Sequence, residues 1–117
     1  MRHLKKGKKF HRKKGQRAAL LKGLLNNLIL KEKIQTTEVK AKALKSKAEK
    51  LVTIAKKQNL SAFRTATSRL SNKKSAYKLY HEIAPRYLQR HGGYLRVIKS
   101  AKTRKGDGAR MAILEFV

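Results

Sequence analysis

The 117-residue sequence contains no cysteine, a single proline and only six acidic residues. Without cysteine the chain cannot form a disulfide, a thiolate zinc site or a cysteine nucleophile. The same absence gives no sign of an oxidising compartment, so the cytoplasm is the expected location. The six carboxylates are scattered and provide no pair for acid–base catalysis.

Long apolar runs are also absent. The longest leucine-rich stretch, residues 20–30, is broken by polar residues and is shorter than the roughly 20 residues that span a bilayer. No small-residue cleavage site follows it, so we expect the basic N terminus to be mature and not a secretory signal. A cationic membrane-active protein is disfavoured because the most basic segment is too rich in glycine and charge to bury apolar area.

The residues that most often carry chemistry lack suitable neighbours. Among the four histidines, only His81 has a possible co-ligand nearby, the adjacent Glu82, and consecutive helical side chains point in different directions. A closed zinc site needs four clustered ligands. The glycines at 92–93 and 106–108 do not match a phosphate-binding loop and are better explained by turns. The sequence therefore predicts no enzyme, metal site, cofactor or small-molecule substrate.

Positive charge is what the chain has in excess. Thirty-two lysines and arginines give a formal net charge of +26 and a pI near 11.1. The first 31 residues hold eleven of these cations and no carboxylate. Such closely spaced cations repel one another, so without a polyanion the segment should stay solvated and disordered. A nucleic acid is the expected partner, because a domain this basic has the electrostatic character of a phosphate binder.

Hydrophobic periodicity predicts four helices. They cover residues 15–31, then 38–57, then a short helix capped by Ser61, and finally a segment between residues 73 and 91 in which Pro85 should distort the last turn. The first helix should bury Ala18, Leu21, Leu24, Leu25 and Leu28. Thr37 is placed to cap the second helix, one face of which packs while its other faces stay basic.

Three short segments have strand character. Residues 94–99 and 111–117 predict a hairpin joined by a basic, mobile loop over 100–110, and residues 33–37 should add a third strand. The predicted fold is α+β: a two-layer domain with several helices against a small three-stranded sheet. We expect an extended basic arm over residues 1–14 and a single globular domain over 15–117.

The aromatic and acidic residues have mostly structural interpretations. Phe63, Tyr80, Tyr87 and Phe116 lie on apolar stripes and should pack in the core. Glu38 should complement the dipole of its helix, and Glu49 can pair with Lys42 or Lys45. Phe10 stands alone in the basic arm without packing partners, which favours its insertion against RNA or a neighbouring protein.

We predict nucleic-acid contacts mainly from the arm, with arginines suited to bidentate phosphate contacts and lysines acting as point charges. The expected contact residues in and beside the arm are Arg2, His3, Lys5, Lys6, Lys8, Lys9, Phe10, Arg12, Lys13, Lys14 and Arg17. Those expected on the body are Lys42, Arg86, Arg90, His91, Arg96, Arg104 and Lys105. No RRM, KH or zinc-finger signature is present, so base-specific readout is not indicated. A general nucleic-acid or chromosome-compacting protein would be equally compatible with this charge.

Several segments occur in an informative order: MRHLKKGKKFHR, RAALLKGLLNNLILKEKIQTTEVKAKAL, AEKLVTIAKK, IAPRY, HGGYLRVIK and RKGDGARMAILEF. Together they closely resemble the bacterial family of large-subunit ribosomal protein seventeen over nearly the whole chain. The least distinctive part is residues 60–78. The family often has Ser-Ser-His-Arg where this chain has residues 14–17, and proline where it has Arg110.

This resemblance implies a non-catalytic, cytoplasmic ribonucleoprotein component that binds large-subunit ribosomal RNA and supports subunit assembly and translation. It also implies a helical body with a small mixed sheet and a place near the exit of the nascent-chain tunnel. Neighbours in the family include the large-subunit proteins numbered twenty-two and thirty-two.

Overall fold

The computed structural model describes residues 8–117, so the predicted contacts of Arg2, His3, Lys5 and Lys6 lie outside the described residues. The helices are α1 (Lys14–Lys31), α2 (Glu38–Ala55), α3 (Leu60–Leu70) and α4 (Lys73–Lys78). A π-helical turn (Leu79–Ile83) and a 3-10 turn (Ala84–Tyr87) continue α4. The strands are β1 (Lys33–Thr37), β2 (Leu95–Thr103) and β3 (Arg110–Phe116).

The three strands form one sheet in the order β1-β3-β2. Leu114 of the central strand lies opposite Ile34 on one side and Val97 on the other. Both pairings are antiparallel, so the mixed sheet implied by the family resemblance is wrong. The physical reason is that β1 and β2, which run in the same direction, are separated by β3 and never pair.

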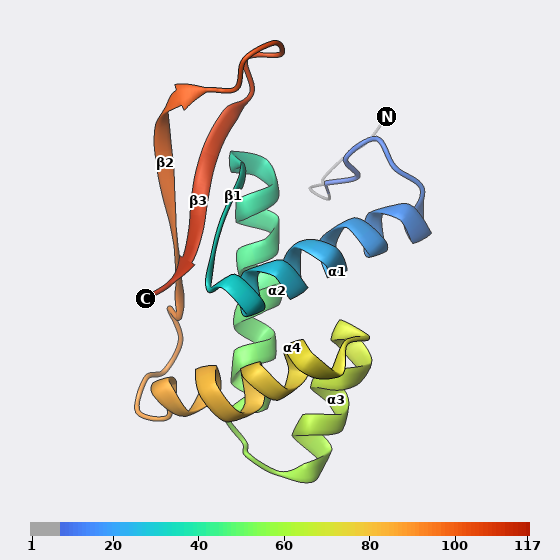
Figure 1. Cartoon of the computed structure of the whole chain (residues 1–117), viewed down its shortest axis with the longest axis vertical. Coiled ribbons are helices and arrows are strands. Elements are labelled where there is room, and N and C mark those ends of the chain that lie inside the picture. The colour runs from blue at the N-terminus through green and yellow to red at the C-terminus, as the bar shows by residue number, and fades with distance from the viewer. Residues whose placement is uncertain (1–7) are drawn as a thin grey trace, which may run out of the picture.

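The predicted α+β architecture is confirmed. Figure 1 shows the sheet standing along one side of α2, with α1 and α4 crossing that helix. The core lies between these layers and is made mainly of leucine and alanine: Leu21, Leu25, Leu28, Ile29, Ala41, Leu44, Ala48, Leu51, Val52, Ala55, Leu70, Leu79, Ile83, Tyr87, Tyr94 and Leu114. Because α2 contacts both the sheet and the other helices, it is the central element of the domain.

The core differs from the predicted stripes in a few places. On α1, Ile29 is buried and Ala18 is exposed, so the buried residues lie closer to the C-terminal end of the helix than predicted. Tyr87 is buried as predicted, whereas Phe63, Tyr80 and Phe116 are only half-buried.

Two helix starts show why the exact caps were hard to predict. Asn59, and not Ser61, caps α3, because its Oδ1 accepts a hydrogen bond from the Ala62 N–H at 2.7 Å. Thr37 occupies the capping position of α2 as predicted, but its side chain makes no capping hydrogen bond.

The only proline of the sequence explains how the helical region ends. Pro85 lies at the start of the 3-10 turn, where its missing N–H removes a helical hydrogen bond, and the predicted distortion is confirmed. Tyr87 then donates its hydroxyl to the Val117 carbonyl at 2.7 Å, and the Val117 N–H donates to the Tyr94 carbonyl at 2.9 Å. The first bond attaches the end of the chain to the helical layer, and the second attaches it to the start of β2.

The hairpin loop is shorter and more tightly bonded than predicted. β2 runs on to Thr103, and the Arg104 N–H donates to the Ala109 carbonyl at 2.9 Å. Gly106 and Gly108 have φ values of 97° and 66°, which favour glycine, so the reversal occurs where the sequence predicted it. Across residues 8–117 we find no helix with the length and apolar character that crossing a membrane would require.

Candidate nucleic-acid interface

A groove between α1, α2 and α3 brings together four cations from three helices. Its floor is apolar, and its rim is formed by Lys22 of α1, Lys47 and Lys50 of α2, and Arg69 of α3. We call these four residues and the space between them the basic groove. Its volume is about 380 Å³, and none of the described residues lining it is acidic.

Helix geometry explains this arrangement. Lys47 and Lys50 are three residues apart and therefore share one face of α2. Arg69 lies in the last turn of α3, and Lys22 reaches the same helix end, donating a hydrogen bond to the Ser71 hydroxyl at 3.0 Å. Within residues 8–117 the four side chains make no ion pair with a carboxylate. Their charges are therefore available to an external anion.

The sequence did not single out these four residues as contacts. Lys47 and Lys50 belonged to a generally basic helix, while Lys22 and Arg69 were isolated cations on separate helices. A single sequence carries no signal for the groove, because it depends on which helices lie next to one another.

The described part of the predicted arm leads into the same region. Lys8, Lys9, Arg12, Lys13 and Lys14 are exposed and make no ion pair in the described part of the chain. Arg17 is half-buried. Ala18 follows Lys14 by one helical turn and lines the basic groove, so the groove begins within the first turns of α1, directly after the arm.

The prediction that Phe10 has no packing partners is wrong. Its ring is half-buried and packs against the hydrophobic core. Phe10 and His11 have left-handed backbone angles, and the Arg12 N–H donates to the Lys9 carbonyl at 3.1 Å, so the chain turns there and returns the ring to the domain. The arm is therefore not extended at this point.

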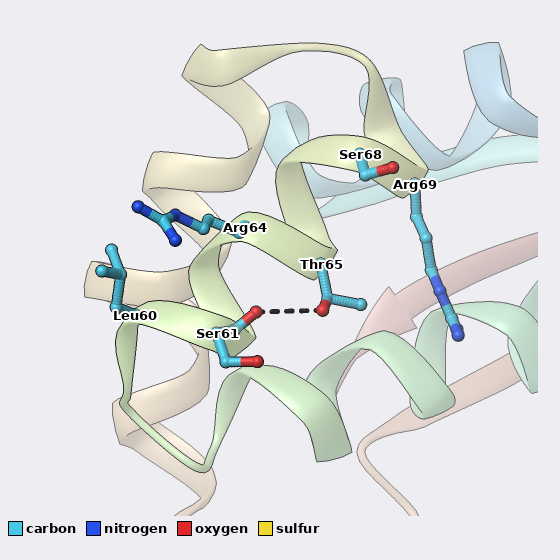
Figure 2. Close-up of a pocket in the computed structure, with 6 residues that line it drawn as sticks. All are labelled: Leu60, Ser61, Arg64, Thr65, Ser68 and Arg69. Carbon is cyan, nitrogen blue, oxygen red and sulfur yellow. Dashed lines mark hydrogen bonds between the residues drawn. The ribbon is translucent and has the colours of Figure 1, made fainter.

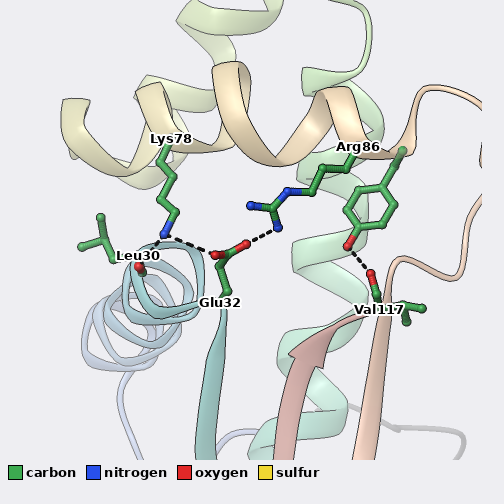
Figure 3. Close-up of polar contacts among 6 residues, drawn as sticks. Leu30, Glu32, Lys78, Arg86 and Val117 are labelled. Carbon is green, nitrogen blue, oxygen red and sulfur yellow. Dashed lines mark hydrogen bonds and ion pairs between the residues drawn. The ribbon is translucent and has the colours of Figure 1, made fainter.

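Figure 3 shows how Glu32 joins the end of α1 to the fourth helical segment. Its carboxylate accepts a hydrogen bond from Arg86 and forms an ion pair with Lys78 at 3.7 Å, and Lys78 also donates to the Leu30 carbonyl at 2.7 Å. The hydrogen bond from Arg86 is the main reason that the pKa of Glu32 lies below its ordinary value. Arg86, a predicted nucleic-acid contact, thus has a partner inside the protein.

Three other predicted contacts are also paired. Lys42 lies 2.8 Å from Glu38, Arg96 donates to Glu115 at 2.7 Å, and Arg104 binds Asp107. By contrast, Arg90, His91 and Lys105 are exposed and form no ion pair among residues 8–117. The nucleic-acid contacts of all these residues stay predictions, and those of the paired cations would compete with carboxylates inside the protein.

The predicted pairing of Glu49 with a lysine of its own helix is wrong. Its carboxylate instead accepts the Tyr94 N–H at 3.1 Å, which gives a buried backbone donor a partner. Lys56 donates to the Tyr94 hydroxyl at 2.8 Å, and this hydrogen bond lowers the pKa of Tyr94. These contacts fix the start of β2 against α2. No group of three His, Cys, Asp or Glu side chains that could hold a metal occurs in the part of the chain that the structure describes.

The Arg104–Asp107 pair should resist acid. The hydrogen bond from Arg104 lowers the pKa of Asp107 to about 2, from an ordinary value of 3.8. Because the pKa of Asp107 is lower in the folded protein, the pair contributes fully to folding stability above pH 3.8. This contribution is lost as pH falls through about 2. NMR titration of the Asp107 carboxyl carbon should show this, and Arg104→Gln should return the pKa toward 3.8. An unchanged titration in that variant would contradict the assignment.

Comparison with known proteins gives a consistent result. A family model described as ribosomal protein L17 matches residues 20–117. A relative from Sulfurihydrogenibium sp. is 51% identical, with 100% of this chain and 97% of the relative covered. One from Persephonella marina is 53% identical over 100% of this chain and 95% of its own length. One from Fusobacterium nucleatum is 43% identical, with both chains covered in full. All three are named large ribosomal subunit protein bL17.

Proposed function

The chain belongs to the ribosomal protein L17 family, and on that basis we propose that it binds large-subunit ribosomal RNA, mainly through phosphates, as a structural constituent of the subunit. It is a non-enzymatic component of the bacterial large subunit, and its location is therefore cytoplasmic. The resemblance seen in the sequence is confirmed at the level of the family.

The observation that supports the RNA contact is the basic groove. Four cations surround a space with no acidic lining among the described residues, so a phosphate entering it meets only favourable charge. Each phosphate neutralised releases counterions, which makes the affinity fall steeply with salt. An apolar floor beneath the cations lowers the local dielectric and strengthens their effect.

We further propose that residues 1–14 and 15–117 divide this work. The globular part presents the groove, while the arm adds cations that contact neighbouring RNA segments. A role in subunit assembly follows, since the arm would connect RNA segments.

The proposal also includes a position near the exit of the nascent-chain tunnel, beside the large-subunit proteins numbered twenty-two and thirty-two. This part is supported by the family resemblance alone. Crosslinking from exposed lysines in intact subunits, followed by mass spectrometry, tests it directly. Crosslinks to other proteins, with none to these two, would contradict the position without affecting the RNA contact.

Sedimentation of a cell lysate at moderate salt, with and without ribonuclease, tests the proposed function. We expect the chain to travel with large subunits in equal proportion and to be released when the RNA is digested. Association with chromosomal DNA would instead support a general nucleic-acid-binding protein. A chain that stays free at the top of the gradient would contradict the proposal.

A further inference from the structure

An aromatic surface lies where α3 packs against the helical segment that begins at α4 (Figure 1). Tyr77 and His81 have ring centroids 4.2 Å apart and planes tilted by 37°. Tyr80 meets His81 edge to face at 4.8 Å, and Phe63 meets Tyr80 at 5.4 Å. We call these four residues the aromatic patch.

The patch is open to solvent on its outer side. Tyr77 is 57% exposed and His81 is exposed, whereas Phe63 and Tyr80 are half-buried beneath them. The two inner rings therefore support the two outer rings. A large aromatic side chain left this exposed gains little from folding, so its burial by a partner would be favourable.

The helix backbone brings these rings together. Tyr77, Tyr80 and His81 are spaced i, i+3 and i+4, and the π-helical turn from Leu79 to Ile83 includes the last two of these residues. The Tyr80 carbonyl accepts a hydrogen bond from the Gln58 side chain at 2.9 Å. Such π-helical turns are rare and frequently occur at functional sites.

Lysines border the patch on the α4 side. On α3, the exposed Arg64 projects from the same side of its helix as Leu60 (Figure 2), and as the residue after Phe63 it points in a different direction from that ring. Lys73 and Lys74, both exposed, precede Tyr77 by one helical turn on its face. Glu82 is adjacent to His81 in sequence, but consecutive helical residues point in different directions.

From these observations we infer that the aromatic patch stacks an unpaired RNA base against Tyr77 and His81, while Lys73 and Lys74 contact the flanking phosphates. The inference rests on the proposed RNA-binding function and names a second, different kind of contact for it. Stacking is tolerant of base identity because every base has a π-face, so no sequence-specific motif is needed. The two neighbouring lysines favour a nucleic acid over an apolar segment of a neighbouring protein.

The test uses the full-length chain and a 12-nucleotide oligoadenylate with 2-aminopurine at its centre, as a single strand and as a duplex. Stacking should quench the 2-aminopurine fluorescence of the single strand. Tyr77→Ala should abolish the quenching and weaken single-strand binding by roughly tenfold, while duplex binding is unchanged. Tyr77→Phe keeps the ring and should behave like the parent chain, and circular dichroism checks that each variant is folded.

The variant Tyr77→Leu distinguishes an RNA base from an apolar protein segment as the occupant of the aromatic patch. Leucine keeps apolar area but has no π-face. If a base stacks on the patch, Tyr77→Leu should therefore lose quenching and single-strand binding as Tyr77→Ala does. If Tyr77→Leu supports normal incorporation into subunits while Tyr77→Ala does not, an apolar protein segment occupies the patch and the inference is wrong. If all variants bind both RNAs like the parent chain, the patch is not a base site although RNA binding stands. If the parent chain binds neither of the two oligonucleotides and does not bind large-subunit ribosomal RNA, the proposed function itself is wrong.

Discussion

Replacing Lys22, Lys47, Lys50 and Arg69 together by glutamine is expected to weaken RNA binding about a thousandfold at 0.1 M salt. Each cation of the basic groove that neutralises a phosphate contributes roughly 0.7 to 0.9 to the slope of log affinity against log salt. The variant should therefore lose about three units of slope. Fluorescence anisotropy with a large-subunit ribosomal RNA fragment, repeated over a range of salt concentrations, measures both quantities.

A matched control exists in the same chain. Lys33, Lys42, Arg96 and Lys99 all pair with Glu38 or Glu115, so replacing them by glutamine removes the same net charge. Because the two carboxylates offset about half of this positive charge, we expect a change in slope about half as large. Equal changes in the two variants would show that affinity follows total charge and that the groove has no special part in it.

Much of the fold was predictable because the relevant signals are local. The apolar spacing of α1 and α2, the β-branched residues of β1 and the glycines before β3 each act within a few residues. The strand order and the capping of α3 by Asn59 were not fixed by such local patterns. The first depends on pairing between segments far apart in the chain, and the second on a choice between two nearby polar residues.

The candidate site was likewise predictable only in part. An excess of cations in the arm can be read from the sequence, since no carboxylate lies near enough to neutralise it. The basic groove could not be found because it combines residues of three helices. The packing of Phe10 was missed for a related reason: its partners are core residues distant in sequence, brought into reach by a turn with left-handed backbone angles.

The ion pairs within residues 8–117 involve only some of the cations. Pairs to Glu32, Glu38, Glu115 and Asp107 occupy cations at the sheet and at the end of α1. The groove and the start of α1 keep their cations unpaired within residues 8–117. Arg90 and Lys105, far from the groove in sequence, are likewise unpaired among the described residues, so a polyanion would be attracted over a wide surface on which the groove is one place where several cations meet.

The orientation of the groove depends in turn on the position of α2, and Leu44→Ala is expected to lower the free energy of unfolding by about 2 to 5 kcal/mol. Leu44 is 0% exposed, and α2 contacts both the sheet and the other helices, so neighbouring elements cannot readily collapse into the cavity. Typical domains are stable by roughly 5 to 15 kcal/mol, so this loss is a large fraction of the total. Urea denaturation should show a lower midpoint at an unchanged slope.

Ser46→Ala provides the control on the same helix, because Ser46 is exposed and lies two residues from Leu44. It should change stability by no more than about 0.5 kcal/mol. At a temperature where Leu44→Ala is still folded, its RNA affinity should be close to that of the parent chain, since it removes no cation. A stability loss below about 1 kcal/mol would contradict the central placement of α2. If the folded Leu44→Ala variant lost RNA affinity, repacking of the core around α2 would be shown to disturb the basic groove at the surface.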